Sequence, residues 1–238
     1  MSKKGASDLS ASTLNASWSY NWNNDQSSGQ DHEYVPIRQQ RYWPGLPTNK
    51  PDSTHLLGFN EPDLAGQANL TVEQALALWP RLQATGMRLG APAVAFGGDR
   101  AGGWLDRFMS GAAARGYRVD FIPLHWYGSD FSTAATGHLQ SYVQAVHDRY
   151  RKPIWVTEYG LIDFTGAQPR YPGQAQQSDF ARRSGAMLNG LIMLGIIVFQ
   201  IACDRRLPPL HFVRPAGDRL PIDPRQHLLT RVVFERRD

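Results

Sequence analysis

Two glutamates in this sequence each follow directly on a short apolar segment. Glu61 stands in the run GFNEPD and Glu158 in the run WVTEYG. Burying a carboxylate costs free energy unless the group is paired or used, so both positions are informative. Two carboxylates on one face of a protein can carry out acid/base chemistry, with one group as the acid and the other as nucleophile or base. Taken alone, Glu61 could equally be a helix N-cap or a salt-bridged strand end.

A third polar run, LHWYG, ends another apolar segment and contains His125, Trp126 and Tyr127. Together with the two glutamates, this run favours catalysis over a purely structural role. The alternative is a metal site, which would draw on Glu61, Asp63, His125 and His32. No two of these four have the helical or short spacing that metal-ligand pairs show, so we predict no metal.

Aromatic residues near the other predicted strand ends are candidates for ligand contacts. Trp18, Tyr20 and Trp22 alternate along one segment. We expect Trp18 in the core, whereas Trp22, near the end of the segment, could stack on a ligand such as a sugar. Trp43 lies in the run RYWPG and has no periodic reason to be buried, which favours a ligand platform. The residues that we predict to bind substrate are Asn60, His125, Trp126, Tyr127, Tyr20, Trp22 and Trp43.

Strand-like and helix-like segments alternate along the chain and place these residues at strand ends. The strand-like segments are residues 3–7, 16–22, 34–39, 55–60, 87–93, 120–127, 153–158 and 196–202. Helical patterns run over 103–114, 138–150 and 177–191, and another begins at Thr71, which has capping-box spacing to Gln74. The alternation predicts an α/β fold with a parallel sheet. Eight strands in this length indicate a compact (β/α)8 TIM barrel, with an open doubly wound sheet as the alternative. In such a barrel, active sites lie at the C-terminal ends of the strands.

Alternation along a strand predicts which side chains share a face. In residues 153–158, Val156 and Glu158 fall on one face, so we expect Trp155 to pack outward under the helices if Glu158 points into the barrel. Asn60 and Glu61 are adjacent and cannot both point inward from a regular strand. A bulge or a tight turn before Pro62 would aim both of them inward.

Composition and charge exclude several classes of protein. The chain has 238 residues, of which 42% are hydrophobic, and we predict one catalytic domain over residues 1–238 with an irregular segment at about 205–238. The net charge is +4, but the basic residues do not form a run interleaved with aromatics, so we predict no nucleic-acid partner. The apolar stretch at 187–202 is short for a membrane span and is interrupted by Asn189 and Gln200, so we predict no membrane partner.

Other general features are consistent with a monomeric enzyme without a cofactor. Cys203 is the single cysteine and cannot form an internal disulfide. The glycine pairs at 97–98 and 102–103 lack the spacing of a dinucleotide-binding loop, so we expect no nucleotide cofactor. The N-terminus has no apolar signal segment, so the protein is cytoplasmic unless a leader has been removed, in which case it is secreted or periplasmic.

Six short motifs in this order resemble glycoside hydrolase family 128, also described as the alkali-sensitive-linkage-protein-like glycosyl hydrolase catalytic core. The motifs are SWSYNW, YVP, LLGFNEPD, GQAN, LHWY and PIWVTE, and the resemblance covers roughly residues 3–200. It implies a clan A (β/α)8 barrel that hydrolyses β-1,3-glucan with retention of configuration. Two departures from the family pattern are the insertion IRQQ after Pro36 and the run VFQ in the last strand, where the family has a tryptophan.

The resemblance also implies roles for individual residues. Glu61 would be the acid/base, Glu158 the nucleophile, Asn60 a ligand of the sugar 2-hydroxyl and Tyr127 a hydrogen-bond partner of the nucleophile. The expected activity is that of a retaining endo-β-1,3-glucanase acting on laminarin- or curdlan-like glucan. Two alternatives stay open at this point. One is another clan A β-glucanase, acting on β-1,4 or mixed linkages or from chain ends, and the other is a β-glucan-binding protein without turnover.

Overall fold

The structure is a computed structural model that describes residues 4–7, 18–20, 22, 33–38, 53–191 and 197–199. Each of the eight predicted strand segments contains a strand or overlaps one. The strands are β1 (Lys4–Ser7), β2 (Trp18–Tyr20), β3 (Glu33–Tyr34), β4 (His55–Leu56), β5 (Arg88–Leu89), β6 (Ile122–Gly128), β7 (Ile154–Leu161) and β8 (Ile197–Phe199). The helices are α1 (Val72–Gln83), α2 (Trp104–Ala114), α3 (Ala135–Tyr150) and α4 (Gln174–Gly190), close to the four predicted patterns.

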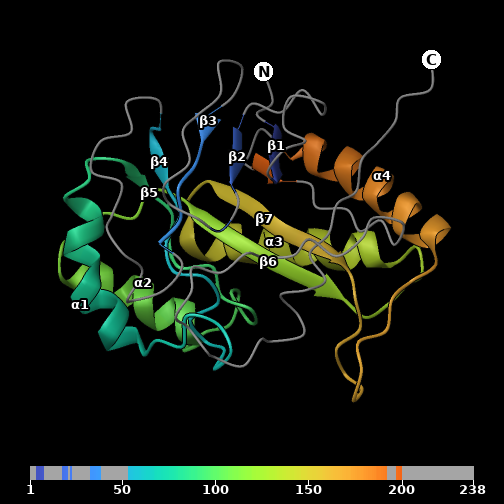
Figure 1. The fold of residues 1–238 in the computed structure, drawn as a ribbon, viewed down its shortest axis with the longest axis horizontal. Helices are drawn as coiled ribbons and strands as arrows, with labels where there is room; N and C mark the ends of the chain where they lie inside the picture. The colour runs from blue at the N-terminus through green and yellow to red at the C-terminus, as the bar shows by residue number, and fades with distance from the viewer. Residues whose placement is uncertain are drawn as a thin grey trace, which may run out of the picture.

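All strand pairs within the sheets are parallel, as the alternation predicts. Six strands form one sheet in the order β3-β2-β1-β8-β7-β6, and β4 and β5 form a second sheet (Figure 1). Two isolated parallel bridges connect the sheets, one between Ile37 and Leu57 and the other between Gly90 and Phe121. The C-terminal ends of strands that follow one another in the sheet therefore lie at the same edge.

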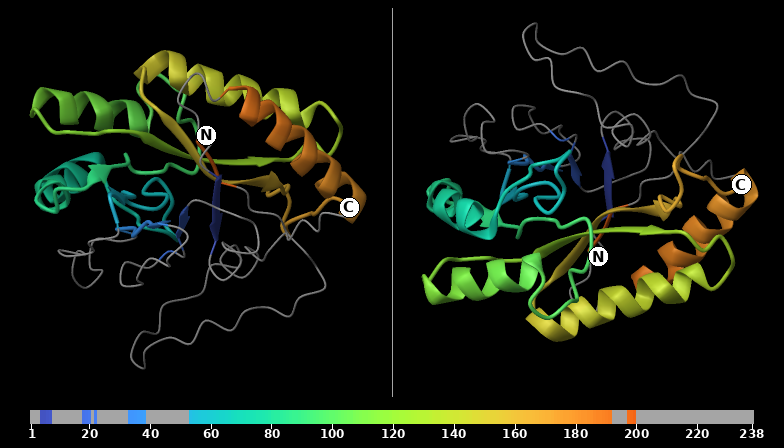
Figure 2. Two further views of the ribbon diagram at one scale, coloured as in Figure 1. Left: turned by 90° about the horizontal axis from the view of Figure 1, so that it is seen from above. Right: turned by 90° about the horizontal axis from the view of Figure 1, so that it is seen from below.

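The helices cover the outer side of the strands. α3 and α4 lie on the same side of the long β6–β7 ribbon, while α1 and α2 pack on each other (Figure 2). α1 begins at the capping box that the sequence predicts, in which Thr71 accepts a hydrogen bond from the Gln74 backbone and the Gln74 side chain accepts one from the Thr71 backbone. Apolar residues of the helices and the outward-facing strand residues form one helix-facing core, which includes Trp79, Phe108 and Tyr159.

A second group of buried side chains, which we call the inner cluster, lies on the opposite face of the strands. Its members are Trp18, Tyr20, Val35, Ile37, Leu57, Phe121 and Trp155. The ring of Trp155 lies 4.7 Å from that of Trp18 and 4.4 Å from that of Phe121. The expectation that Trp155 packs outward under the helices is therefore wrong, whereas the expectation of a buried Trp18 is confirmed.

A β-bulge in β7 explains the error. The register between β6 and β7 is even as far as Val156 and resumes at Glu158, so Thr157 is one extra residue on β7. A bulge of this kind shifts the phase of the side-chain alternation. Trp155 can therefore join the inner cluster while Glu158 still points into the same interior.

Two predictions concern residues that the structure does not describe. The irregular segment at about 205–238 falls outside the described residues. Of the VFQ run that departs from the family pattern, Val198 and Phe199 form the end of β8, whereas Gln200 falls outside the described residues. A search of the described helices finds none that combines the length and the apolar character required to cross a membrane.

Candidate active site

The backbone that follows β4 is irregular at Asn60 and Glu61. Asn60 forms a parallel bridge with Ala93, and the Glu61 backbone N–H donates to the Ala93 carbonyl at 2.7 Å. Glu61 has a positive φ of 41°, the left-handed conformation that non-glycine residues seldom adopt. Both residues are buried, at 4% and 8% exposure. A left-handed residue therefore stands where a bulge or a tight turn was predicted, and the turn itself, closed by the Leu64 N–H and the Glu61 carbonyl at 3.0 Å, begins at Glu61.

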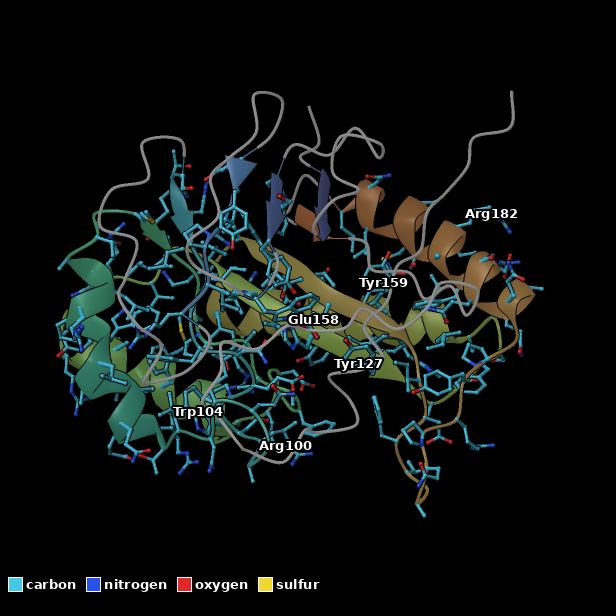
Figure 3. The ribbon with its side chains drawn as sticks, viewed as in Figure 1. Arg100, Trp104, Tyr127, Glu158, Tyr159 and Arg182 are labelled. Atoms are coloured by element: carbon cyan, nitrogen blue, oxygen red, sulfur yellow. The ribbon has the colours of Figure 1, made fainter. Side chains whose placement is uncertain are left out.

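Glu158 lies in the middle of β7 and is also buried, at 3% exposure (Figure 3). Three donors bind its carboxylate. Trp22 Nε1 donates to Oε1 at 2.8 Å, the Tyr127 hydroxyl donates to Oε2 at 2.9 Å, and the Tyr20 hydroxyl lies 3.3 Å from Oε1. These three hydrogen bonds fix the position and orientation of the Glu158 carboxylate.

The two tyrosines are held in their protonated form by their surroundings. Burial and, after it, the charge of Glu158 raise the pKa of both Tyr20 and Tyr127 well above the ordinary value for tyrosine. Each hydroxyl therefore keeps its proton and donates it to a hydrogen bond. The resemblance implies this contact for Tyr127, whereas we had predicted substrate binding for Tyr20 and Trp22.

His125 links the two glutamates. Its Nδ1 lies 3.0 Å from Glu61 Oε1 and 3.5 Å from Glu158 Oε2, and the residue is 3% exposed. Burial by itself would lower the pKa of His125, but the charge of Glu158 and the hydrogen bond and charge of Glu61 outweigh it and raise the pKa above its usual value. A protonated His125 would offset the negative charge of both carboxylates.

The three residues form one compact group. One ligand atom each from Glu61, His125 and Glu158 lies within 4.8 Å of the others. In the part of the chain that the structure describes, no other three His, Cys, Asp or Glu side chains meet this closely. A nitrogen and two carboxylate oxygens could also bind a divalent metal, and the absence of a metal stays a prediction. Asp63 does not belong to the group, and His32 lies outside the described residues.

Asn60 has a partner that sequence reasoning missed. Its Nδ2 donates to Gln67 Oε1 at 3.1 Å, while its Oδ1 is buried without a hydrogen-bond partner among the described residues. An unsatisfied buried amide oxygen can accept a hydrogen bond from a ligand hydroxyl, as the predicted contact with a sugar would require. Gln67 belongs to the GQAN motif that contributes to the family resemblance, and this motif could have indicated its role.

One other predicted site residue is not brought to this group. Trp126 points from β6 toward the helices, where its ring stacks on Phe180 of α4 at 5.7 Å. His125 and Tyr127 flank it in β6 and point to the other face, as alternation requires. Trp43 lies outside the described residues.

We expect Tyr127→Phe to lower kcat on β-glucan by about 10- to 100-fold, because a hydrogen bond to a buried charge is lost while the ring remains. The measurement is steady-state hydrolysis alongside thermal unfolding. Tyr159→Phe is the matched control, since that hydroxyl contacts Ser184 at 3.4 Å on the helix-facing side of β7 (Figure 3). Equal activity of the two variants would contradict a functional role for the hydrogen bond between Tyr127 and Glu158.

The raised pKa of His125 predicts a pH dependence of stability. A group with a raised pKa in the folded state contributes its full stabilisation below its unfolded pKa of about 6.5 and loses it as the pH rises through the folded pKa. We therefore expect the Tm of the wild type to fall over this window and the Tm of His125→Asn to fall less steeply. The control is His138→Asn, at an exposed position of α3, which should keep the wild-type slope. A wild-type slope in His125→Asn would show that His125 is not the titrating group.

Comparison with known proteins identifies the family to which the chain belongs. The family described as glycosyl hydrolase catalytic core matches residues 2–194. The chain belongs to this family and, within it, to glycoside hydrolase family 128.

Three relatives illustrate the similarity. A family 128 subgroup I endo-β-1,3-glucanase from Amycolatopsis mediterranei, solved with laminaritriose, is 55% identical, with a TM-score of 0.77 over 84% of this chain and 88% of that one. A family 128 subgroup III curdlan-specific exo-β-1,3-glucanase from Blastomyces gilchristii, solved with glucose, is 26% identical, with a TM-score of 0.64 over 83% of this chain and 88% of that one. Alkali-sensitive linkage protein 1 of Schizosaccharomyces pombe is 35% identical in an alignment of 158 residues that covers 62% of this chain. The matched segment spans only 27% of the length of that curated relative.

Proposed function

We propose that this protein is a retaining endo-β-1,3-glucanase. The observation that carries the proposal is the buried group of Glu61, His125 and Glu158, in which two carboxylates face each other across one histidine. The similarity to a subgroup I endo-β-1,3-glucanase at 55% identity supports the substrate class and the endo mode.

The first step forms a covalent glycosyl-enzyme. A Glu158 oxygen forms a bond to the anomeric carbon while the bond from that carbon to the glycosidic oxygen breaks. Glu61 gives its proton to the departing oxygen, so the leaving chain departs as an alcohol. The hydrogen bonds from Trp22, Tyr20 and Tyr127 orient the nucleophile before the attack.

The second step releases the sugar. Glu61, now ionised, takes a proton from a water molecule, and the water oxygen attacks the anomeric carbon as the bond to Glu158 breaks. Two inversions give net retention. His125 contacts both carboxylates and acts as a positioning residue that balances their charge as the proton leaves and returns to Glu61.

The closeness of the two carboxylates supports their action as one pair. One oxygen of Glu61 and one of Glu158 lie within 4.8 Å of each other. Retention requires the two carboxyl groups to be about 5–5.5 Å apart, whereas inverting enzymes leave about 6.5–9.5 Å for a water molecule, and the anomer that is released first tests this part of the proposal. In addition, solved variants of the Amycolatopsis enzyme carry substitutions at two glutamates 97 positions apart, which is also the spacing between Glu61 and Glu158.

We also propose that the eight strands form a closed (β/α)8 barrel. The two isolated bridges support this arrangement, because one connects the chain after β3 with β4 and the other connects β5 with the start of β6. With these links, each strand has a neighbour on both sides. The inner cluster would then fill the barrel interior below the catalytic group.

The test of the proposed function is product analysis on a panel of soluble β-glucans. We expect laminarin to be cut to a series of oligosaccharides, with the new reducing ends appearing first as the β-anomer in proton NMR. A β-1,4-glucan should remain uncut. Initial release of the α-anomer would reject retention, release of glucose alone would reject endo action, and binding without new reducing ends would favour a glucan-binding protein.

A further inference from the structure

Phe96 is the one large apolar side chain that is exposed among the residues with described side chains. Its relative exposure is 66%. A single exposed apolar residue is common on protein surfaces and by itself needs no explanation. The loop that carries Phe96, residues 95–99, is unusual in how firmly it is held.

Side chains from two parts of the chain hold the backbone of this loop. The carboxylate of Asp63 accepts hydrogen bonds from the N–H groups of Ala95 at 2.9 Å and Phe96 at 3.2 Å. On the other side of the ring, Gly98 donates its N–H to the hydroxyl of one α3 tyrosine at 3.2 Å and accepts from the hydroxyl of another at 3.0 Å. The Arg149 guanidinium, also from α3, donates to the Asp99 carbonyl at 2.8 Å. The ring of Phe96 therefore stands on a backbone that is fixed on both sides.

The loop is also tied to the segment that carries the proposed acid/base. Asp63 follows Glu61 by two positions, and the Glu61 N–H bonds to the carbonyl of Ala93, three residues before Phe96. The side chains that contact Glu158 come instead from β6 and from the chain at and just after β2. From these backbone links we infer that Phe96 lies on the Glu61 side of the site.

The chemistry of the reaction indicates what would occupy that side. Glu61 protonates the oxygen of the departing sugar, so a group next to Glu61 meets the leaving chain rather than the sugar attached to Glu158. A β-linked glucosyl ring carries its hydroxyl groups at the edge and presents C–H groups on its faces. A flat, exposed phenyl ring suits the C–H face of a sugar. A side chain whose backbone is already fixed loses little conformational entropy when the sugar binds.

We propose that Phe96 is a stacking platform for a glucosyl residue of the leaving chain, and that the Asp63 carboxylate and the α3 side chains hold it in place. This inference rests on the proposed function, because it takes Glu61 as the acid/base. On this proposal, Phe96 raises kcat/KM for substrates whose leaving group is a sugar chain.

The test compares substrates with and without a leaving sugar. Phe96→Ala should lower kcat/KM on laminarioligosaccharides by about five- to tenfold, the loss expected for one aromatic contact. The same variant should hydrolyse an aryl β-laminaribioside, whose leaving group is a nitrophenol, at the wild-type rate. Phe96→Tyr keeps the ring and should restore activity on the oligosaccharides. Arg100→Ala, at an exposed position next to the loop, should behave as wild type on both substrates.

The outcomes separate this inference from the proposed function. If the wild type cleaves neither substrate, the proposed function fails. If the wild type cleaves both, and Phe96→Ala is unchanged on both or loses the same factor on both, only the platform is rejected. Thermal unfolding should be the same for wild type and Phe96→Ala, because the ring is exposed and leaves no cavity.

Discussion

Glu158→Gln is expected to reduce the hydrolysis of every β-glucoside by on the order of 10⁴-fold or more, because the amide cannot form the covalent intermediate. The loss should be the same for natural glucan and for an aryl glycoside, since both need the nucleophile in the first step. Glutamine is close in size to glutamate, and its amide oxygen can still accept hydrogen bonds from Trp22 or Tyr127. We therefore expect the variant to fold and to bind laminarioligosaccharides.

The matched control is Glu73→Gln, which makes the same chemical change at an exposed position of α1. It should keep wild-type activity and stability. Measured rates on laminarin and on the aryl glycoside, with binding followed by calorimetry, decide the outcome. Residual activity of Glu158→Gln within tenfold of the wild type on either substrate would mean that another group is the nucleophile.

Glu61→Ala is expected to separate the two steps of the reaction. On natural glucan, kcat/KM should fall by about 10²–10⁴-fold, because the leaving alkoxide is no longer protonated. On an aryl glycoside with a good leaving group, formation of the glycosyl-enzyme should be much less affected. The intermediate should then accumulate, since no general base activates water, and a burst of released phenol equal to the enzyme concentration should be seen.

Azide provides the stereochemical test of the same assignment. It needs no general base, so it should rescue Glu61→Ala on the aryl glycoside and give the β-glycosyl azide. For Glu158→Ala, azide can enter the space left by the nucleophile and should give the α-azide from a substrate of β configuration. NMR of the products distinguishes the two anomers. The opposite pairing of variant and product would reverse the roles of Glu61 and Glu158.

The periodic features of this sequence predict its elements well. The β-like segments coincide with strands, and the capping box at Thr71 marks the start of α1. These features depend on neighbours a few residues away, which the sequence displays directly. An irregularity at Asn60 and Glu61 was also predicted, as a bulge or a tight turn, but the sequence did not indicate that a left-handed Glu61 would form it.

The orientation of side chains around the bulge could not be read from the pattern. Thr157 looks like any other strand residue, yet it is the extra residue that places Trp155 and Glu158 in the same interior. The donors to Glu158 raise a similar difficulty. Tyr20 and Trp22 lie 138 and 136 positions away from Glu158, and only the sheet order brings them next to it. Sequence reasoning identified both residues as functional through a substrate contact, which stays a prediction, and did not indicate their hydrogen bonds to Glu158.

The left-handed backbone at Glu61 means that this site opposes the stability of the fold that carries it. A non-glycine residue in that region is strained by on the order of 1–2 kcal/mol. Glycine at position 61 would remove this strain, although it would also remove the contact with His125. The backbone conformation of this residue in the active site therefore lowers the stability of the fold. An inactive protein altered at Glu61 should be a robust scaffold for capturing intact glucan chains, and selection for heat resistance alone would favour loss of this glutamate.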